Sequence, residues 1–565
     1  MTDITIQKIP IIVGITGHRD LCENEIDLLS EKIREVFRFL RKHYPDTPLL
    51  LLTPLAEGAD RLAAKAALSE KIDYIAPLPL PKAEYLKDFS TQELKDEFND
   101  LFGKARDRFE LPILEGNTAE NIAEYGPNRD RQYALVGAYI ARHCHILIAL
   151  WDGNDLNKVG GTSQVVKFRL EGDMRDLPEK YKPPRNPLDL PDIGPVCHIK
   201  TSRQCGESLL ESGQITILYP EQPHQHELKY LLSESLNMLD KFNRDVEAHS
   251  ERLNKGILDS QEHLVPEEIQ KRLSDPFRKM LAIYGEANIL ARYFQDRTRT
   301  AMKTIFGLSL LMVLFYSLYS AWKHPVFLII YFIAFIGACL QFNRVEKQAY
   351  PSKSLDFRAL AEGLRVQIFW LLGGLDNDSA ADFYLRKHRG ELDWIRRGIR
   401  ALCVHNWVND KQSIALVKRH WVEHQKVYFE KAAPENRDSL SSQKRWADRL
   451  FCAGLIIAGQ LLGFNVFFQK IPILHDIIII LIGFLPAFGA VLRAYAQKRA
   501  YDAHAKQYAF MAGLFKRASD ALEKHKNDEA KSIEILRELG KAALEENSEW
   551  VLLHRERSLE IPKGT

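Results

Sequence analysis

Short apolar runs alternate with amphipathic stretches through roughly the first 220 residues of the chain. Helical spacing of the apolar positions marks residues 25–42, 60–69 and 129–143. Several apolar runs between these helices have no polar face, which is typical of strands covered by helices on both sides. The alternation predicts a doubly wound α/β sheet over residues 1–222. The predicted strands cover residues 11–16, 48–53, 72–76, 111–114, 146–151 and 196–200.

The second half of the chain contains four apolar stretches in two closely spaced pairs. The first pair covers residues 304–322 and 325–342, and the second covers residues 450–468 and 473–492. Each stretch is close to the roughly 20 residues that a helix needs to cross a bilayer, and none has a charge at its centre. A buried core helix would explain one such stretch but hardly two pairs. We therefore expect an all-α membrane domain with four transmembrane helices in two hairpins.

Lysine and arginine gather outside the open ends of both hairpins, whereas each tight turn carries one lysine, Lys323 or Lys470. Because basic residues stay on the cytoplasmic side, we expect a multi-pass membrane protein with both termini in the cytoplasm. The centres of the spans contain no Asp, Glu, Lys or Arg, which disfavours a proton-coupled transporter or a voltage sensor. The predicted segments are a helical stalk over 223–303, hairpins over 304–342 and 450–492, a cytoplasmic helical segment over 343–449 and cytoplasmic helices over 493–565.

Composition narrows the range of functions. The net charge is +2 and the pI is near 8.0, so the basic excess of a dedicated nucleic-acid binder is missing and we expect no nucleic-acid partner. The seven cysteines are scattered without a C-x-x-C pair, which favours reduced thiols over disulfides or a zinc site. The first residues do not read as a signal peptide.

Turns rich in small residues follow three of the predicted strands. The first strand runs into Gly14-Ile15-Thr16-Gly17-His18-Arg19, and the second is followed by Glu57-Gly58-Ala59-Asp60. After the strand over 146–151 come Asp152-Gly153 and then Gly160-Gly161-Thr162. Each turn alone is as easily structural as functional. Together they should meet at the carboxyl edge of the sheet, where backbone N–H groups and helix N-termini bind anions, so we expect a phosphate-binding pocket there.

Two further clusters are candidates for the same pocket. Arg131 and Tyr133 lie in the first turn of a predicted helix, where they contact either a ligand or solvent. His198, Thr201 and Arg203 follow the last predicted strand with alternating polar side chains, a pattern that also fits an exposed edge. The predicted ligand-binding residues are Gly14, Thr16, Gly17, His18, Arg19, Glu57, Gly58, Asp60, Arg131, Tyr133, Asp152, Gly153, Gly161, Thr162, His198, Thr201 and Arg203.

The histidines of the His143-Cys144-His145 run raise the question of a metal site. In a strand the two histidines would share one face, but no further ligands follow at a suitable spacing. We therefore predict neither a metal ion nor a resident cofactor.

The segments GITGHR, LAEGAD, RDRQYALVGAYIARHCHILIALWDG and VGGTS, within residues 8–220, together resemble the SLOG superfamily. That superfamily includes the lonely-guy phosphoribohydrolases and the DNA-processing Rossmann proteins. Residues 225–550 resemble, in architecture, the SLATT type of membrane domain. The resemblance implies a Rossmann-like domain that senses a nucleotide second messenger, either a cyclic oligonucleotide or an ADP-ribose derivative. It also implies a homo-oligomeric effector of bacterial antiviral defence that permeabilises the inner membrane.

One departure from the enzymes of that superfamily bears on catalysis. They carry P-G-G-x-G-T-x-x-E, whose glutamate serves cleavage of the glycosidic bond, whereas here Gly160-Gly161-Thr162-Ser163 is preceded by Val159 and followed by Gln164 and Val165. We therefore expect a sensor rather than an enzyme. Two alternatives remain open: a membrane-tethered phosphoribohydrolase-like enzyme that uses Glu57 or Asp60, and a passive membrane scaffold with a vestigial pocket.

Overall fold

The computed structural model divides the chain into two compact units. One unit comprises Met1–Glu286 with Leu360–Lys411, and the other Ala287–Ala359 with Gln412–Thr565. The predicted domain boundaries remain predictions. The structure describes residues 6–172, 177–178, 193–204, 211–219, 223–225, 229, 232–376, 378–385, 392–405, 410–464, 468 and 470–555.

The first unit is built on a mixed, mostly parallel sheet with strand order β4-β3-β2-β1-β5-β6-β7-β8. Neighbouring strands from β4 to β6 pair in parallel, while β7 and β8 add antiparallel pairs at one edge. The order reverses at β1, which lies between β2 and β5, and this creates the switch point of a Rossmann-like sheet. The strands are β1 (Ile11–Gly17), β2 (Leu49–Leu52), β3 (Asp73–Leu78), β4 (Asp107–Glu110), β5 (Ile146–Trp151), β6 (Val196–Lys200), β7 (Ile215–Leu218) and β8 (Pro223–Gln225).

The predicted α/β sheet is confirmed, with one strand misplaced and two missed. The observed β4 reads DRFE and precedes the predicted strand over 111–114. Its residues alternate between half-buried and exposed at the sheet edge, so the strand lacks the apolar run on which the prediction relied. The antiparallel strands β7 and β8 at the opposite side of the sheet were not predicted.

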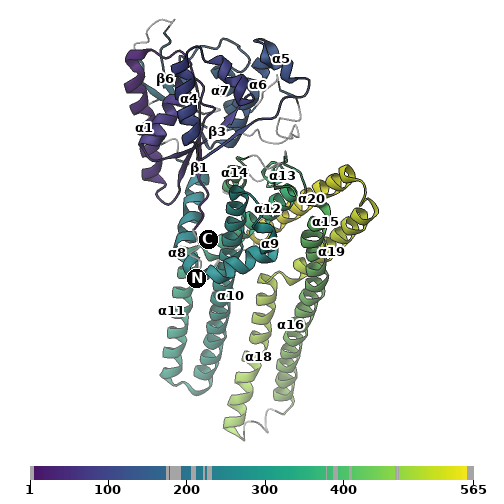
Figure 1. The fold of residues 1–565 in the computed structure, drawn as a ribbon. Coiled ribbons are helices and arrows are strands. Elements are labelled where there is room, and N and C mark those ends of the chain that lie inside the picture. The colour runs from purple at the N-terminus through teal and green to yellow at the C-terminus, as the bar shows by residue number, and fades with distance from the viewer. Residues whose placement is uncertain are drawn as a thin grey trace. The chain divides into compact units, whose positions relative to one another are not determined.

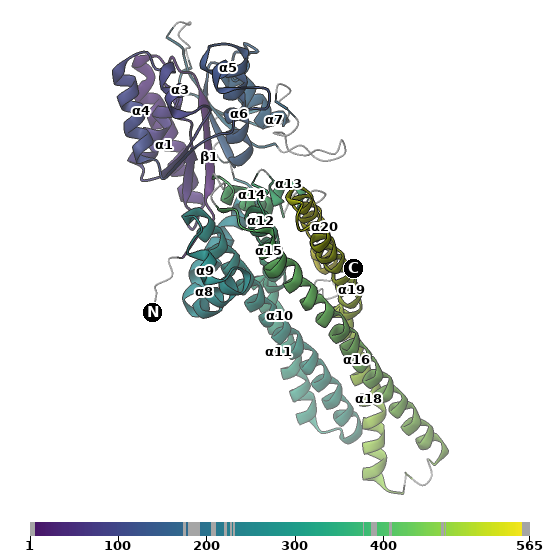
Figure 2. The same ribbon diagram turned by 45° about the vertical axis from the view of Figure 1, so that its right-hand side comes forward.

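Helices cover both faces of this sheet (Figures 1 and 2). α1 (Ile26–His43) packs against α2 (Ala59–Ser69), and α6 (Pro127–His143) packs against α7 (Thr162–Glu171). The inward stripe of α1 has the helical spacing that the sequence shows, because Leu29, Ile33, Val36, Phe37 and Leu40 are all buried. The smaller helical elements of this layer are η1 (Glu23–Glu25), α3 (Lys82–Tyr85), η2 (Leu86–Asp88), α4 (Gln92–Lys104) and α5 (Ala119–Ala123).

The amino edge of the sheet is joined to helices by buried polar side chains. Asn243 of α8 (Glu234–Leu264) accepts a hydrogen bond from Ile9 N at 3.0 Å and donates one to Ile9 O at 2.9 Å. Asp240, one turn earlier, accepts from Thr47 Oγ1 at 2.8 Å, just before β2. Glu286 accepts from Gln7 N at 3.1 Å. The other helices that lie wholly in this unit are α9 (Glu267–Gln270), α13 (Ala380–Phe383) and α14 (Asp393–Leu402).

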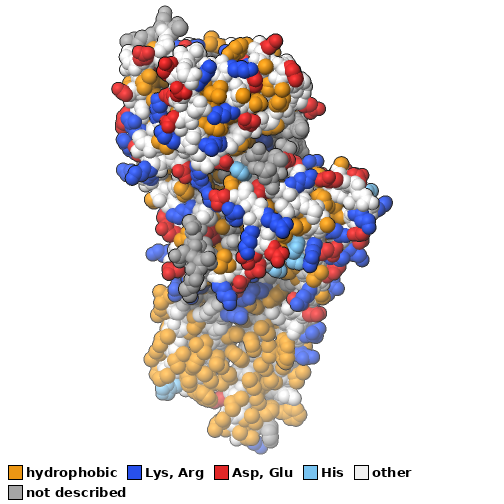
Figure 3. Space-filling model, in the orientation of Figure 1, with side chains coloured by type: hydrophobic (Ala, Val, Ile, Leu, Met, Phe, Trp, Pro, Cys, Tyr) orange, Lys and Arg blue, Asp and Glu red, His pale blue; other side chains and the backbone are white. Residues whose placement is uncertain are grey.

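The second unit is helical, and its long helices expose large apolar side chains. Ile333 and Leu340 of α11 are 64% and 65% exposed, and Ile473 of α18 is 69% exposed. Figure 3 shows the resulting orange surface over the ends of these helices. The elements are α10 (Asp275–Trp322) and α12 (Tyr350–Leu372), which both units share, α11 (Pro325–Gln348), α15 (Ile414–Val417), the π-helical η6 (Lys418–Glu423), α16 (His424–Gly463), α18 (Pro472–Lys498), α19 (Tyr501–Lys524) and α20 (Glu529–Arg555).

Three helical segments within the described residues are long and apolar enough to cross a membrane, not the four that the sequence predicted. They are Asp275–Trp322, Pro325–Leu372 and Pro472–Lys524. The fourth predicted span, over residues 450–468, begins inside α16, but that helix ends at Gly463. The apolar part of α16 is therefore shorter than the roughly 20 residues of a usual helical crossing. Residues 465–467 of this span lie outside the described part of the chain.

Candidate ligand-binding site

The loops after β1 and β2 dock closely at the carboxyl edge of the sheet. Ala59 N donates to His18 O at 3.0 Å, which fixes the start of α2 against the end of β1. A Cβ on Gly17 would lie 2.4 Å from the Cβ of Ala59, and one on Gly58 would lie 2.4 Å from His18 O. Gly58 also has φ +74°, which a residue with a side chain adopts only with strain. These glycines therefore allow the backbones to meet.

The start of α7 forms the opposite wall. Gly160 has φ +72°, and a Cβ there would lie 2.8 Å from the Cβ of Tyr133 on α6. Gly161 is the N-cap of α7 and supplies no side chain to it. The first N–H groups of the helix, including those of Thr162 and Ser163, have no carbonyl partner within it. The positive end of the helix dipole faces the same space and attracts anions.

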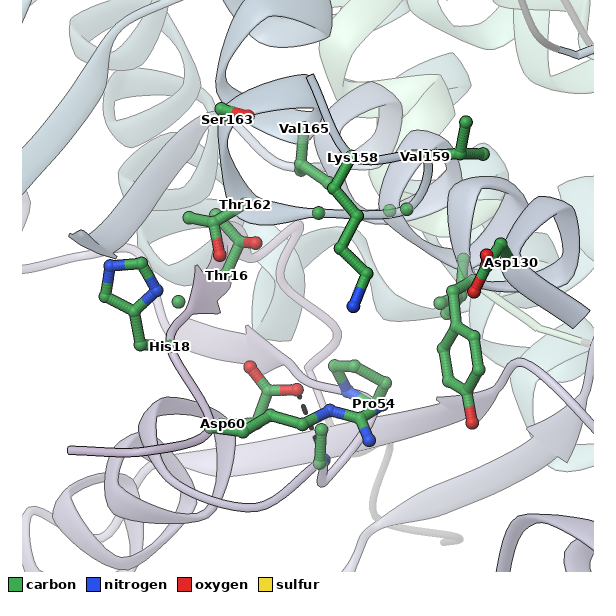
Figure 4. A pocket seen from close by; sticks show the side chains of 18 of the residues that line it. Thr16, His18, Pro54, Asp60, Asp130, Lys158, Val159, Thr162, Ser163 and Val165 are labelled. Atoms are coloured by element: carbon green, nitrogen blue, oxygen red, sulfur yellow. Dashed lines mark hydrogen bonds between the residues drawn. The ribbon is translucent and has the colours of Figure 1, made fainter. Parts of the chain in front are cut away.

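A cavity of about 370 Å³ lies between these walls. Figure 4 shows Thr16 and Thr162 close together on one side of it, with Asp130 on the other. The side chain of Lys158 reaches into the middle of the cavity from the loop before α7. Lys158 is exposed, and among the described residues no carboxylate forms a salt bridge with it. A hydroxyl pair, a helix N-terminus and an unneutralised ammonium group suit a phosphate or another anion.

His18 is held in one orientation by the loop after β5. Its Nε2 lies 3.0 Å from the backbone nitrogen of Asp152 and 3.2 Å from Asp152 Oδ1. Burial lowers the pKa of His18, and the charge of Asp152 opposes that shift only in part. A neutral ring whose Nε2 accepts the backbone N–H carries its proton on Nδ1. His18 therefore presents an uncharged ring with an Nδ1–H donor at the carboxyl edge of the sheet.

A buried ion pair supports the aromatic wall of the cavity. Asp88 accepts from Arg129 Nη2 at 2.6 Å, and each of these side chains is only 3% exposed. The hydroxyl of Tyr133 donates to the same carboxylate. Arg19 lies 3.8 Å from Asp88 and stacks over the Tyr133 ring with its carbon Cζ 5.1 Å from the ring centroid. The network positions one half-exposed cation, Arg19, at the cavity surface.

Asp60 is the buried acid of the cavity. Its side chain accepts a hydrogen bond from Ala56 N at 3.2 Å, and the residue is 6% exposed. Burial raises the pKa of Asp60 to about 7, against the weaker opposing effects of that hydrogen bond and of the charges of Arg19 and Arg61. Both protonation states of this carboxyl group are therefore accessible near neutral pH.

The structure places just over half of the predicted residues at the cavity surface. The lining residues among them are Thr16, Gly17, His18, Arg19, Asp60, Tyr133, Gly161, Thr162 and Arg203. The others lie outside the lining and have local structural contacts or solvent exposure. They are Gly14, Glu57, Gly58, Arg131, Asp152, Gly153, His198 and Thr201.

The contacts of these other residues explain their places. A Cβ on Gly14 would lie 2.8 Å from Ile140, so Gly14 allows α6 to approach β1. The Nε2 of His198 lies 2.9 Å from Trp151 O, and Thr201 Oγ1 donates to Ile199 O at 2.8 Å. Arg131 is exposed on α6.

Sequence reasoning missed several residues that line the cavity. Asp88 and Arg129 pair across 41 positions of the chain, which no local motif reveals. Lys158 lies three residues before the predicted Gly161 and Asp130 directly precedes the predicted Arg131, so proximity to these positions was the available signal. The other polar or aromatic lining residues that were missed are Asp20, Tyr85, Tyr125, Trp151, Asn154 and Ser163.

The histidines on either side of Cys144 lie in a structural setting. The Nδ1 of His145 accepts a hydrogen bond from Ile12 N at 2.9 Å, and the Nδ1 of His143 lies 2.8 Å from Tyr139 O. Burial lowers the pKa of both imidazoles to about 3, so both rings are neutral. Among the described residues, no group of three or more potential ligands forms a metal-binding cluster.

Comparison with known proteins adds no assignment. No family model matches the chain, and no curated protein has a significantly similar sequence. Function has to be argued from the cavity and from the apolar helices.

Proposed function

We propose that the protein is a membrane effector of bacterial antiviral defence that is switched by a nucleotide-derived signal. The signal, a cyclic oligonucleotide or an ADP-ribose derivative, binds at the carboxyl edge of the sheet, and an oligomer of the helical unit then permeabilises the inner membrane. The observation that carries the proposal is the open anion subsite. The N-cap of α7 makes no side-chain cap, and Lys158 reaches into the middle of the cavity with no salt bridge within the described residues.

The size and lining of the cavity support a nucleotide rather than a bare phosphate. Its volume, about 370 Å³, lies in the range of small-molecule sites. Tyr125 and Trp151 add aromatic surface to the anion subsite, and Arg203 adds a further cation. Aromatic rings stack on nucleobases, while cations and backbone N–H groups bind phosphates.

The membrane part of the proposal includes a fourth crossing over residues 450–468, to which α16 contributes its C-terminal part up to Gly463. Gly454 allows α16 to approach α18 so closely that a Cβ there would lie 2.6 Å from Pro486 Cγ. The outer side of the same segment is apolar and open, since Leu455, Ile456 and Leu462 are 59%, 62% and 85% exposed. Such a surface is stable in lipid and unfavourable in water.

Four crossings would return the chain to its starting side. The basic residues beside the open ends of the hairpins, among them Arg297, Lys347, Lys444 and Arg493, favour a cytoplasmic location for that side. Both termini and the sheet would then lie in the cytoplasm, where a nucleotide signal is made. The ligand acts as a switch only if it binds one arrangement of the oligomer more tightly than another.

Dye release from proteoliposomes tests the proposal. The purified protein in vesicles of anionic phospholipid should release a trapped dye after addition of a cyclic dinucleotide, a cyclic trinucleotide or ADP-ribose. Lys158→Glu, a charge reversal at an exposed position, should abolish the response. Arg131→Ala, at an exposed position outside the cavity, should retain it. Equal release by both variants would reject the cavity as the switch, and no release by the wild-type protein with any of these nucleotides would favour a passive scaffold.

A phosphoribohydrolase-like enzyme remains the second candidate because one observation favours it. Of the two acids considered as substitutes for the missing glutamate, Asp60 lines the cavity and Glu57 does not. A buried acid with a pKa of about 7 is suited to proton transfer. The first turn of α7 supplies no acid, because Gln164 Oε1 accepts from Gly160 N at 2.7 Å and Val165 is buried. Sustained release of free base from nucleoside monophosphates would establish the enzyme and reject a pure sensor.

A further inference from the structure

We propose that the cavity binds its anionic ligand together with a proton, and that Asp60 takes up this proton. The inference rests on the proposed ligand site and adds a mode of regulation to it. Binding would strengthen when the cytoplasm becomes more acidic.

The geometry of Asp60 makes its charge important for any anion in the cavity. The residue occupies the first turn of α2, behind the docked loops after β1 and β2. In Figure 4 its carboxyl group points into the cavity, toward the side on which Thr16 and Thr162 lie. The amino group of Lys158 ends across the cavity from it. An anion held by Lys158 and the threonines would therefore lie against the Asp60 carboxyl group.

The cations near Asp60 are engaged elsewhere. Arg61, its neighbour on α2, donates to Leu55 O at 3.2 Å and Leu94 O at 2.9 Å and forms an ion pair with Glu97 at 2.7 Å. Arg19, in the loop after β1, stacks on Tyr133 and faces Asp88.

The remaining titratable groups around Asp60 do little to stabilise its ionised form. Burial lowers the pKa of His18 and raises that of Tyr85, so both are neutral near pH 7. Asp88 of η2 is an acid, and Lys158 is the cation that the ligand itself would use. Among the described residues, the backbone N–H of Ala56 is the group that hydrogen bonds to the Asp60 side chain.

The two protonation states of Asp60 have opposite effects on an anion. An ionised carboxylate repels a phosphate oxygen, and the repulsion is strong where water is excluded. A protonated carboxyl group donates an O–H hydrogen bond to the same oxygen. Because burial raises the pKa of Asp60 to about 7, the proton is available close to physiological pH. Above that pH the affinity should fall by about tenfold per pH unit, because binding has to recruit the proton from solution.

Calorimetry of the full-length protein in detergent measures this proton directly. The probes are ADP-ribose and sulfate, because neither titrates between about pH 6 and pH 9, whereas phosphate monoesters titrate near pH 6. At pH 8, titrations in two buffers of different ionisation enthalpy should show uptake of about one proton per ligand. Asp60→Asn supplies a neutral donor, so it should bind without proton uptake, with an affinity that no longer depends on pH. Asp73→Asn, an exposed acid at the start of β3, is the matched control and should keep the uptake.

The outcomes separate the inference from the proposed function. If neither ADP-ribose nor sulfate binds at any pH, the ligand site and the inference both fail. If a probe binds without proton uptake, or if Asp60→Asn keeps the pH dependence, the inference fails and the ligand site stands. The wild-type measurement decides the question even if the variant does not fold.

Discussion

The polar groups at the two edges of the sheet differ in whether the protein itself supplies their hydrogen-bond partners. At the amino edge, side chains from elsewhere in the chain satisfy the backbone before the strands begin. Asn243, which is fully buried, binds both the N–H and the C=O of Ile9, and Asp240 binds Thr47 and Asp46 N. Even the buried His145 accepts the Ile12 N–H. These backbone groups are satisfied by the protein itself, although a cavity of about 750 Å³ opens at the same edge beside the starts of β2, β3 and β4.

At the carboxyl edge, comparable groups remain available. The N-caps of α2 and α7 are glycines that accept no hydrogen bond through a side chain. Lys158 extends into open space (Figure 4), and Asp60 has one hydrogen-bond donor in the described structure. The difference supports the proposal that the ligand binds at the carboxyl edge.

Glu286 is an exception at the amino edge. One of its oxygens accepts the Gln7 N–H, while Oε2 is buried with no hydrogen-bond partner among the described residues. Burial raises the pKa of this carboxyl group to about 8, so it is mostly protonated at neutral pH. Glu286 is thus one acid at this edge that is neutral rather than paired with a cation.

The largest effect that separates the two edges is expected from Asn243→Leu. The change leaves the N–H and C=O of Ile9 without partners in a buried place, which should cost about 3 kcal/mol of stability and lower the melting temperature by several degrees. The affinity of the folded fraction for ligand should be unchanged. Thermal unfolding followed by circular dichroism measures the loss, and Asn237→Leu at an exposed position of α8 is the control. A loss of ligand affinity in Asn243→Leu would contradict a ligand site at the carboxyl edge.

Lys158→Ala should weaken ligand binding without changing the stability of the free protein. Removing a charged donor from an anion should weaken binding by about 2 kcal/mol, or roughly thirtyfold, whereas the melting temperature of the free protein should not change. Titration calorimetry with ADP-ribose measures the affinity. Lys167→Ala, on α7 but paired with Asp155, provides the control and should bind normally. Unchanged binding by Lys158→Ala would place the anion elsewhere.

Asp60→Asn should stabilise the free protein at high pH. The native pKa of about 7 lies above the ordinary value of 3.8, so the folded state binds more protons than the unfolded state between these values. Stability is therefore lost as the pH rises from about 4 through 7, so asparagine should raise the stability clearly at pH 8 and little near pH 4. Melting temperatures of both proteins across this range test the sign. A difference that does not vary with pH would rule out titration of Asp60.

The smallest effect is expected from Arg131→Ala. Arg131 is exposed and lies outside the cavity lining, so affinity for ADP-ribose should change by less than about twofold. A large loss would show that the recognition surface extends along α6 beyond the cavity.

The layered fold could be predicted from the sequence because its central strands are apolar throughout. β1, β2 and β5 are buried along most of their length and stand out as runs of isoleucine, leucine and valine. β4, with the sequence DRFE, has no such run and was misplaced. In the membrane half, composition identified the apolar stretches, but it did not show where α16 ends.

From the sequence, the site could be predicted only where glycine turns mark it. Gly17, Gly58 and Gly161 mark the meeting of strands and helices, which is a local property of the sequence. The pair of Asp88 and Arg129 depends on the tertiary arrangement, and the neutrality of His18 depends on burial. Glu57 and Gly153 were predicted because they belong to the same turns, but they do not line the cavity.

The missing cap of α7 has a consequence for the motion of the free protein. A glycine at an N-cap costs only a few tenths of a kcal/mol relative to serine, threonine or aspartate, but Gly161 leaves the first N–H groups of α7 without a side-chain acceptor at the N-cap. The first turn of α7 should therefore open more often than the strands beneath it, and its amide hydrogens should exchange early. A bound anion would supply the absent cap. The N–H groups that let the helix end fray are thus the same groups through which a bound anion would gain affinity.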